Sequence, residues 1–265
     1  MSAENMRFEQ RFNAQRVDNG QWHYQLGEEL NGGFGGTNGG VLAAVCVNVA
    51  RQLAPGRRPI GVDARFIRGF RPGSASVIAT VLYSGRTLCT VSVDIFNDEK
   101  LTTRGTVSLV NPEALENIDA GDVQPADGEL KIYEEARIWR EPAAQKIPLI
   151  ETFKPRQLGN SAVSTTTAVD TIWDEPGALE EASCIAADIS VGPPVAAALV
   201  GRSLAMPNPD ISLRFVGAEG APAWLVSTCH LESVNAGIAT TRMQVRDGNI
   251  LVAIGVSTTT CLKAS

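Results

Sequence analysis

The chain has 265 residues, of which 44% are hydrophobic and 20% charged, and its formal net charge is −6. This composition is typical of a globular protein and excludes a disordered or fibrous chain. The negative charge argues against a nucleic acid as a partner, because affinity for nucleic acids comes from neutralising phosphates. The longest apolar run, residues 41–47, is far below the ~18 residues of a membrane span, so no span is expected.

The first residues and the cysteines indicate the cellular compartment. Residues 1–12 alternate acidic and basic side chains and lack the apolar core of a secretion signal, so we predict a cytoplasmic protein. The cysteines lie far apart and form no C-x-x-C pair, which favours reduced thiols in the core. We expect no metal site and no cofactor. The cysteines are Cys46, Cys89, Cys184, Cys229 and Cys261.

Two stretches of the chain, residues 64–110 and 213–262, resemble each other in the order of their β-rich runs and turns. Phe66 and Phe215, at matching places in the two stretches, are 149 positions apart. In each stretch about four β-rich runs are separated by Gly, Asn or Asp, which is typical of an antiparallel meander. The sequence therefore predicts two halves of one architecture.

A long apolar helix is predicted ahead of the strands of the first half. It covers residues 41–53, with Thr37 or Asn38 as the N-cap and a stop at Pro55-Gly56. Because this helix is apolar on most sides, a curved sheet must wrap around it.

The second half has its own helical segment. Residues 180–189 are helical in pattern, Pro193-Pro194 is expected to interrupt the helix, and residues 195–204 are expected to continue as a short second helix. Turn-forming sequences separate the two halves. The predicted units are a first domain over 1–118, a linker over 119–130 and a second domain over 131–265.

Six motifs follow one another along the chain: the glycine-rich segment 35–40 before the first helix, Phe70-Arg71-Pro72-Gly73, Ala187-Asp188 followed by Pro193-Pro194, the segment 209–215, Arg246-Asp247-Gly248, and Leu251-Val252-Ala253. In their order and spacing they resemble the acyl-CoA thioesterase II family and its thioesterase-like relatives. The resemblance covers nearly the whole chain. It implies an α+β double hot-dog fold, with two antiparallel sheets each wrapped around a central helix, and an acyl-CoA as the substrate.

The start of the first helix is a candidate site for polarising a thioester carbonyl. A helix N-terminus has free N–H groups and a partial positive charge, and glycines allow a carbonyl to approach them closely. Gly39 and Gly40 are so placed. The alternative is that residues 32–40 are only a flexible loop leading into the helix.

Asp210 is the predicted catalytic carboxylate. By resemblance it takes the place of the family's acid, which works with a hydroxyl and a glutamine to hold the attacking water. Ser233 is the candidate for the hydroxyl, whereas Ser257 falls where the family has glutamine and is too short to bridge the same gap. The alternative for Asp210 is that it ends a turn and is exposed.

Three further residues are candidates for binding the substrate. Asp188 in the second helix could face the same cavity, or could be a structural hydrogen-bonding group near the helix end. Arg68 and Arg71 could contact the nucleotide phosphates of CoA, although a solvated strand edge explains this basic cluster equally well.

The predicted function is hydrolysis of fatty-acyl or related acyl-CoA thioesters in lipid metabolism. One alternative is a non-catalytic acyl-thioester binding protein, which the missing glutamine favours. Another is a hot-dog hydratase or dehydratase, but the sequence has no D-x-x-x-x-H spacing for an Asp/His pair. Two fused halves can form a complete unit, and association into a homo-oligomer through exposed sheet edges stays open.

Overall fold

A computed structural model of the chain describes residues 8–116, 118, 121, 137–138, 147–160, 164–170, 179–202, 204–216 and 224–263. Within these residues all strands belong to a single antiparallel sheet. The first half contributes β1 (Gln15–Asp18), β2 (Gln21–Leu26), β3 (Arg58–Phe66), β4 (Gly73–Ser84), β5 (Leu88–Asn97) and β6 (Lys100–Val110). The second half contributes β7 (Arg137–Ile138), β8 (Arg156–Asn160), β9 (Ser164–Asp170), β10 (Asp210–Phe215), β11 (Trp224–Asn235), β12 (Ile238–Asp247) and β13 (Ile250–Thr260).

The helices divide between the same two halves. The α-helices are α1 (Phe8–Arg11), α2 (Gly39–Leu53), α3 (Pro148–Phe153) and α4 (Leu179–Ala198). Two short 3₁₀ helices, η1 (Glu28–Leu30) and η2 (Pro112–Ala114), complete the described elements. None of the described helices is long and apolar enough to cross a membrane.

The strand order shows the internal repeat. It runs β1-β2-β4-β5-β6-β3-β10-β13-β12-β11-β9-β8-β7, so that each strand of the first half has a counterpart in the second half and only β7 is additional. At the centre, Asp63 of β3 lies opposite Ser212 of β10, and these residues are again 149 positions apart. An approximate twofold axis therefore passes through this pair.

The predicted pair of separate sheets is wrong, because β3 and β10 join the two halves into one sheet. Each of these strands would be the outer strand of its own half, with a row of unpaired backbone N–H and C=O groups. Pairing β3 with β10 satisfies both rows, from Asp210 opposite Arg65 to Arg214 opposite Gly61. The hot-dog arrangement itself, a long helix against a curved antiparallel sheet, is present in each half.

The first predicted helix is confirmed as α2. Asn38 is its N-cap, and the Asn38 side chain accepts a hydrogen bond of 3.3 Å from the Val41 backbone N–H. Every residue from Gly40 to Ala50 is buried, as expected for a helix that is apolar on most sides.

The second helix differs from the prediction, because α4 continues through Pro193 and Pro194 to Ala198. A proline disfavours helical geometry in the residue before it, through clashes with that residue's backbone N–H and Cβ. Gly192 precedes the first proline and has no Cβ, so the Cβ part of this clash is absent at Pro193. The expected short helix over 195–204 is therefore only the last turn of α4.

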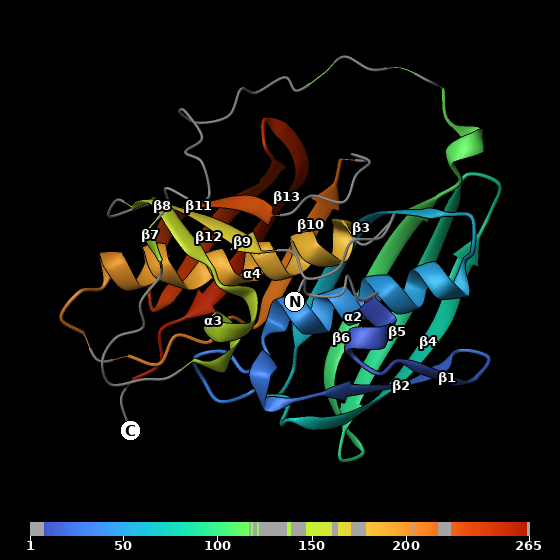
Figure 1. Cartoon of the computed structure of the whole chain (residues 1–265), viewed down its shortest axis with the longest axis horizontal. Helices are drawn as coiled ribbons and strands as arrows, with labels where there is room; N and C mark the ends of the chain where they lie inside the picture. The colour runs from blue at the N-terminus through green and yellow to red at the C-terminus, as the bar shows by residue number, and fades with distance from the viewer. Residues whose placement is uncertain are drawn as a thin grey trace, which may run out of the picture.

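Helices α2 and α4 lie next to each other along the sheet (Figure 1). They are antiparallel, and α2 lies along the N-terminal half of α4: Gly40 of α2 approaches Cys184 and Asp188 of α4, while Arg51 of α2 contacts Glu180. A single hydrophobic core includes residues of both halves. Apart from Gly121, the predicted linker over 119–130 lies outside the described residues, so the domain boundaries stay a prediction.

The sequence analysis missed the strands that precede each long helix. In β2, Trp22, Tyr24 and Leu26 are buried and alternate with exposed polar residues. Alternation of apolar and polar residues with a period of two is typical of a strand, so the sequence itself indicated β2. The pair β8 and β9 occupies the matching place in the second half.

Candidate active site

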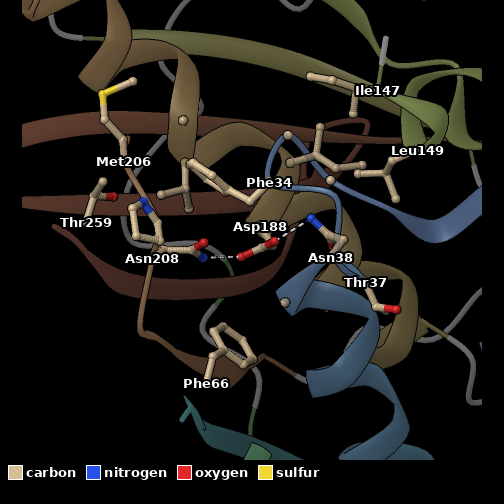
Figure 2. A pocket seen from close by; sticks show the side chains of 18 of the residues that line it. Phe34, Thr37, Asn38, Phe66, Ile147, Leu149, Asp188, Met206, Asn208 and Thr259 are labelled. Carbon is tan, nitrogen blue, oxygen red and sulfur yellow. Dashed lines mark hydrogen bonds between the residues drawn. The ribbon is translucent and has the colours of Figure 1, made fainter. Parts of the chain in front are cut away.

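A cavity of about 860 Å³ opens at the N-terminus of α2 (Figure 2). It borders on solvent at Phe34 and Ile67, whose exposed fractions are 63% and 49%. Its walls come from the loop before α2, the turn after β3, the region of α3, the middle of α4, residues 206–209 and the end of β13. Thr37, Asp188 and Thr259 in these walls are buried, whereas Gly192 and Ala196 of α4 are exposed.

The Asp188 carboxylate of α4 lies at the centre of this cavity (Figure 2). The Asn38 side-chain amide donates to its Oδ2 at 2.5 Å, and the Asn208 side-chain amide donates to its Oδ1 at 2.6 Å. Backbone N–H groups of Gly40 and Gly39, in the first turn of α2, add further hydrogen bonds to the same carboxylate. A helix N-terminus is a favourable place for an anion.

Two opposing effects act on the pKa of Asp188. Burial raises the pKa, because it disfavours the charged form, while the hydrogen bonds from Gly40, Asn208, Asn38 and Gly39 lower it. Burial is the larger effect, so the pKa of Asp188 lies above its ordinary value. A carboxylate with these properties can take up a proton during a reaction.

The second half has extra residues between its helix and its first central strand. Gly39 and Leu179, the first described residues of α2 and α4, are 140 positions apart, whereas the central strands are 149 apart. The second half thus has nine more residues in this interval. The extended segment places Met206 and Asn208 in the cavity wall.

Several predicted site residues meet at this cavity. Gly39, Asp188 and Arg68 line it, and Gly40 lies directly beside Asp188. The Arg68 side chain is exposed and donates to the Leu101 carbonyl oxygen at 3.0 Å. The structure therefore brings together the helix start and the acid of the second helix, which the sequence analysis had singled out separately.

The structure does not place Asp210 in the cavity. Ile211, Leu213 and Phe215 of β10 are buried against the core, so Asp210 belongs to the alternate set of side chains on the outer face of the sheet. Its carboxylate forms an ion pair with Arg65 and accepts a hydrogen bond of 2.8 Å from the Thr258 backbone N–H. The expectation that Asp210 is a desolvated base beside a helix start is thus corrected, because the strand alternation turns it to the other face.

The remaining predicted residues are also outside the cavity wall. Ser257 is buried and donates to the Asp210 carbonyl oxygen at 2.7 Å. Ser233 is exposed on β11, which is separated from β10 by β12 and β13. Arg71 is exposed, and its backbone N–H donates to the Asn97 side chain at 3.0 Å.

Three residues that the sequence analysis did not assign to the site are part of it. They are Asn38, considered only as a helix cap, Asn208 and Thr259. Asn208 stands in a Pro-Asn-Pro segment that carries no motif, so no sequence signal identified it. Among the described residues, His, Cys, Asp and Glu side chains form no group of three that could hold a metal ion.

The opposite end of the helix pair is closed. Asn48 is nine positions after Gly39 in α2, and Asp188 is nine positions after Leu179 in α4. Under the approximate twofold, Asn48 therefore takes in the first half the place that Asp188 takes in the second half. It accepts from the Tyr24 hydroxyl at 2.7 Å and donates to Glu9 at 2.6 Å. The Arg51 guanidinium donates to Glu181 at 2.8 Å. A hydrogen-bonded polar cluster thus fills the position that corresponds to the cavity.

We expect this closed cluster to make stability depend on pH. Burial raises the pKa of Glu181 to about 7, against the opposing attraction of Arg51. The ordinary value is 4.5, so the folded chain binds this proton more tightly than the unfolded chain does. The stabilisation that this proton contributes is fully present below pH 4.5, decreases as the pH rises to about 7, and is absent well above that pH. The free energy of unfolding should rise when the pH is lowered from about 7.5 to about 6.

Denaturant unfolding of Glu181→Gln at several pH values checks this expectation. The variant lacks the titrating carboxyl, so its free energy of unfolding should rise less over the same range than that of the unchanged protein. Glu113→Gln, on the exposed η2 helix, is the matched control and should keep the original slope. Identical slopes for Glu181→Gln and the unchanged protein would contradict the argument.

The fold and the cavity together define a hot-dog protein with a cavity at the N-terminus of α2, beside α4. Residues 29–110 match the family described as the acyl-CoA thioesterase N-terminal domain. No curated protein matches the sequence.

Solved structures resemble the whole chain. A protein from Novosphingobium aromaticivorans DSM 12444, provisionally called a thioesterase, is 22% identical with a TM-score of 0.79, over 95% of this chain and 98% of its own. The acyl-CoA thioesterase II TesB2 from Mycobacterium marinum is 15% identical with a TM-score of 0.74, over 97% and 98%. A protein with a hot-dog fold from Alicyclobacillus acidocaldarius is 14% identical with a TM-score of 0.79, over 97% and 98%. The predicted resemblance is confirmed: the chain has the thioesterase II-like hot-dog fold.

Proposed function

We propose that the chain hydrolyses acyl-CoA thioesters to a free acid and CoA, with Asp188 as the general base. The observation that carries this proposal is a buried carboxylate held by two amide side chains at a helix N-terminus, inside a cavity that reaches solvent. The match of residues 29–110 to an acyl-CoA thioesterase domain supports the substrate class.

In the proposed reaction the ionised Asp188 carboxylate takes a proton from a water molecule, whose oxygen bonds to the thioester carbonyl carbon. The carbonyl oxygen becomes an oxyanion, for which the second N–H of each of the Asn38 and Asn208 side-chain amides is the available donor. The C–S bond then breaks, and the CoA thiolate takes the proton from Asp188. The products are a carboxylic acid and a thiol, and the carboxylate is restored.

Arg68 is the candidate for contacting the CoA phosphates, because it is exposed and lies at the border of the cavity. We expect Arg68→Ala to raise the KM for an acyl-CoA by about two- to fivefold and to leave kcat unchanged, since an exposed charge contact contributes little. Steady-state kinetics at low and high salt measures both effects. Arg86→Ala, on the β4–β5 turn outside the cavity wall, is the control, and an equal KM for Arg68→Ala and Arg86→Ala would remove Arg68 from the site.

A second candidate function is acyl-thioester binding without cleavage. One observation favours it: the Asp188 carboxylate already accepts hydrogen bonds from two asparagines and two backbone amides, as a purely structural cap of α2 would. Assays of purified protein with a chain-length series of acyl-CoAs and a thiol reagent distinguish the two functions. Release of CoA above background supports the hydrolase, and saturable binding without release supports the binding protein.

No observation favours hydration or dehydration of an acyl thioester. That chemistry was expected to need an Asp/His pair, and neither His23 nor His230 lines the cavity. The fatty-acyl nature of the substrate, the role in lipid metabolism and the cytoplasmic location are proposals that rest on the sequence, as is association into a homo-oligomer.

A further inference from the structure

Three hydroxyl groups in the cavity wall have no hydrogen-bond partner among the described residues. They are the Oγ1 atoms of Thr37, Thr167 and Thr259, which are 8%, 1% and 1% exposed as residues. Buried polar groups in proteins are normally hydrogen-bonded, and an unpaired one lowers stability. Unpaired hydroxyls in a ligand cavity therefore indicate a ligand with a polar group at that place.

Thr259 is the hydroxyl that lies next to the proposed reaction centre. The β13 backbone is held against the extended segment of the second half, because the Thr260 N–H donates to the Pro207 carbonyl oxygen at 2.9 Å. Asn208, the next residue in that segment, donates to Asp188. Figure 2 shows Thr259 on the same wall as Met206 and Asn208, whereas the Thr37 side chain is turned away from Asp188.

The orientation of a bound thioester follows from the exposure and the charge of the walls. Phe34, Ile67 and Arg68 are exposed at one border of the cavity, and Gly192 and Ala196 are exposed at another part of its wall. Because Arg68 is the candidate for contacting the CoA phosphates, the long CoA arm leaves the cavity at the border formed by Arg68. The acyl group then lies among the buried lining residues, which include Thr259 and Ile189. The Thr259 hydroxyl therefore faces the first carbons of the acyl group and not the CoA arm.

We infer that Thr259 selects acyl thioesters that carry an oxygen substituent, a hydroxyl or a carbonyl, on one of the first carbons of the acyl chain. The substituent gives the Thr259 hydroxyl the hydrogen bond that no group among the described residues supplies. An unsubstituted acyl group leaves that hydroxyl unpaired when it fills the cavity and excludes water. Sites built for a polar group discriminate in this way against analogues that lack it. This inference rests on the proposed function and deepens it.

The test compares butyryl-CoA with 2-hydroxybutyryl-CoA and 3-hydroxybutyryl-CoA as substrates of the unchanged protein and of Thr259→Val. Valine keeps the shape of threonine without the hydroxyl. We expect the unchanged protein to prefer at least one hydroxylated substrate in kcat/KM, by about tenfold, the size of one neutral hydrogen bond. In Thr259→Val the preference should fall by about the same factor.

Thr167→Val is the matched control, since it removes another buried, unpaired hydroxyl from the same cavity. Thr167 lies on β9, three strands away from β13 in the sheet, so this variant should keep the preference. The inference is overturned if the unchanged protein prefers neither hydroxylated substrate, if Thr259→Val slows all three substrates equally, or if Thr167→Val loses the preference and Thr259→Val does not.

Calorimetric binding of non-cleavable thioether analogues of the three substrates separates this inference from the proposed function. If the unchanged protein releases no CoA from any thioester, hydrolysis fails as the function, and the ratio of Kd values for hydroxylated and plain analogues still decides the role of Thr259. Equal Kd values in the unchanged protein, or no binding of any analogue, overturn the inference. A ratio that disappears in Thr259→Val supports it.

Discussion

Asp188→Asn is expected to lower kcat for acyl-CoA hydrolysis by about 10²- to 10⁴-fold, the contribution of a general base. Asparagine has nearly the shape of aspartate but cannot take a proton from water. The fold should persist, because the amide oxygen can still accept from Asn38 or Asn208, and replacing a buried charge with a neutral group offsets the loss of the other bond. The activity of the unchanged protein should also decrease as the pH falls through the raised pKa of Asp188.

The matched control is Asp210→Asn, which removes the carboxylate that the family resemblance selects. Asp210 pairs with Arg65 on the outer face of the sheet, so its loss should leave kcat within about twofold and change stability little. Rates and thermal unfolding are measured for both variants. A large loss of kcat in Asp210→Asn with an active Asp188→Asn would return the catalytic role to Asp210 and contradict the site proposed around α2.

The elements that carry a strong local pattern could be predicted from the sequence. The apolar segment 41–53 and the repeat that relates Phe66 to Phe215 led to α2 and to the matching strands of the two halves. The joining of β3 to β10 could not be predicted in this way, because edge pairing depends on contacts between residues about 150 positions apart. The path of α4 through Pro193 and Pro194 also differs from the prediction, because a proline pair usually interrupts a helix; Gly192 relieves only part of the clash, at Pro193.

The candidate site was predicted only in part, and the reason is geometric. Gly39 and Asp188 were singled out, but nothing local indicated that they belong to one site, since the antiparallel contact of α2 with α4 brings them together. Asp210 was also singled out from the sequence, but its side chain lies on the other face of the sheet. A side chain in a strand points to one face or the other according to position, and the buried set Ile211, Leu213 and Phe215 puts Asp210 on the outer face.

Gly40→Ala should disrupt the contact between α2 and α4, although alanine is the better helix former by about 1 kcal/mol. A Cβ at position 40 would lie 2.5 Å from the Cys184 carbonyl oxygen, 2.7 Å from the Asp188 Cβ and 2.9 Å from the Ile185 Cα. Two of these atoms belong to the α4 backbone, so the helices must move apart. Overpacking of this kind costs about 1–3 kcal/mol or more, and we expect a net loss of about 2 kcal/mol in the free energy of unfolding.

Because Asp188 is on the displaced helix, the same change should also lower kcat/KM, by about 10²-fold for a shift near 1 Å. Denaturant unfolding and steady-state kinetics measure the two effects together. Gly69→Ala is the control: Gly69 also lines the cavity, but a Cβ there would have no atom within 4 Å, so stability should be unchanged. If Gly40→Ala keeps both its stability and its activity, the helices do not hold the acid against the α2 N-terminus as closely as the proposed chemistry requires.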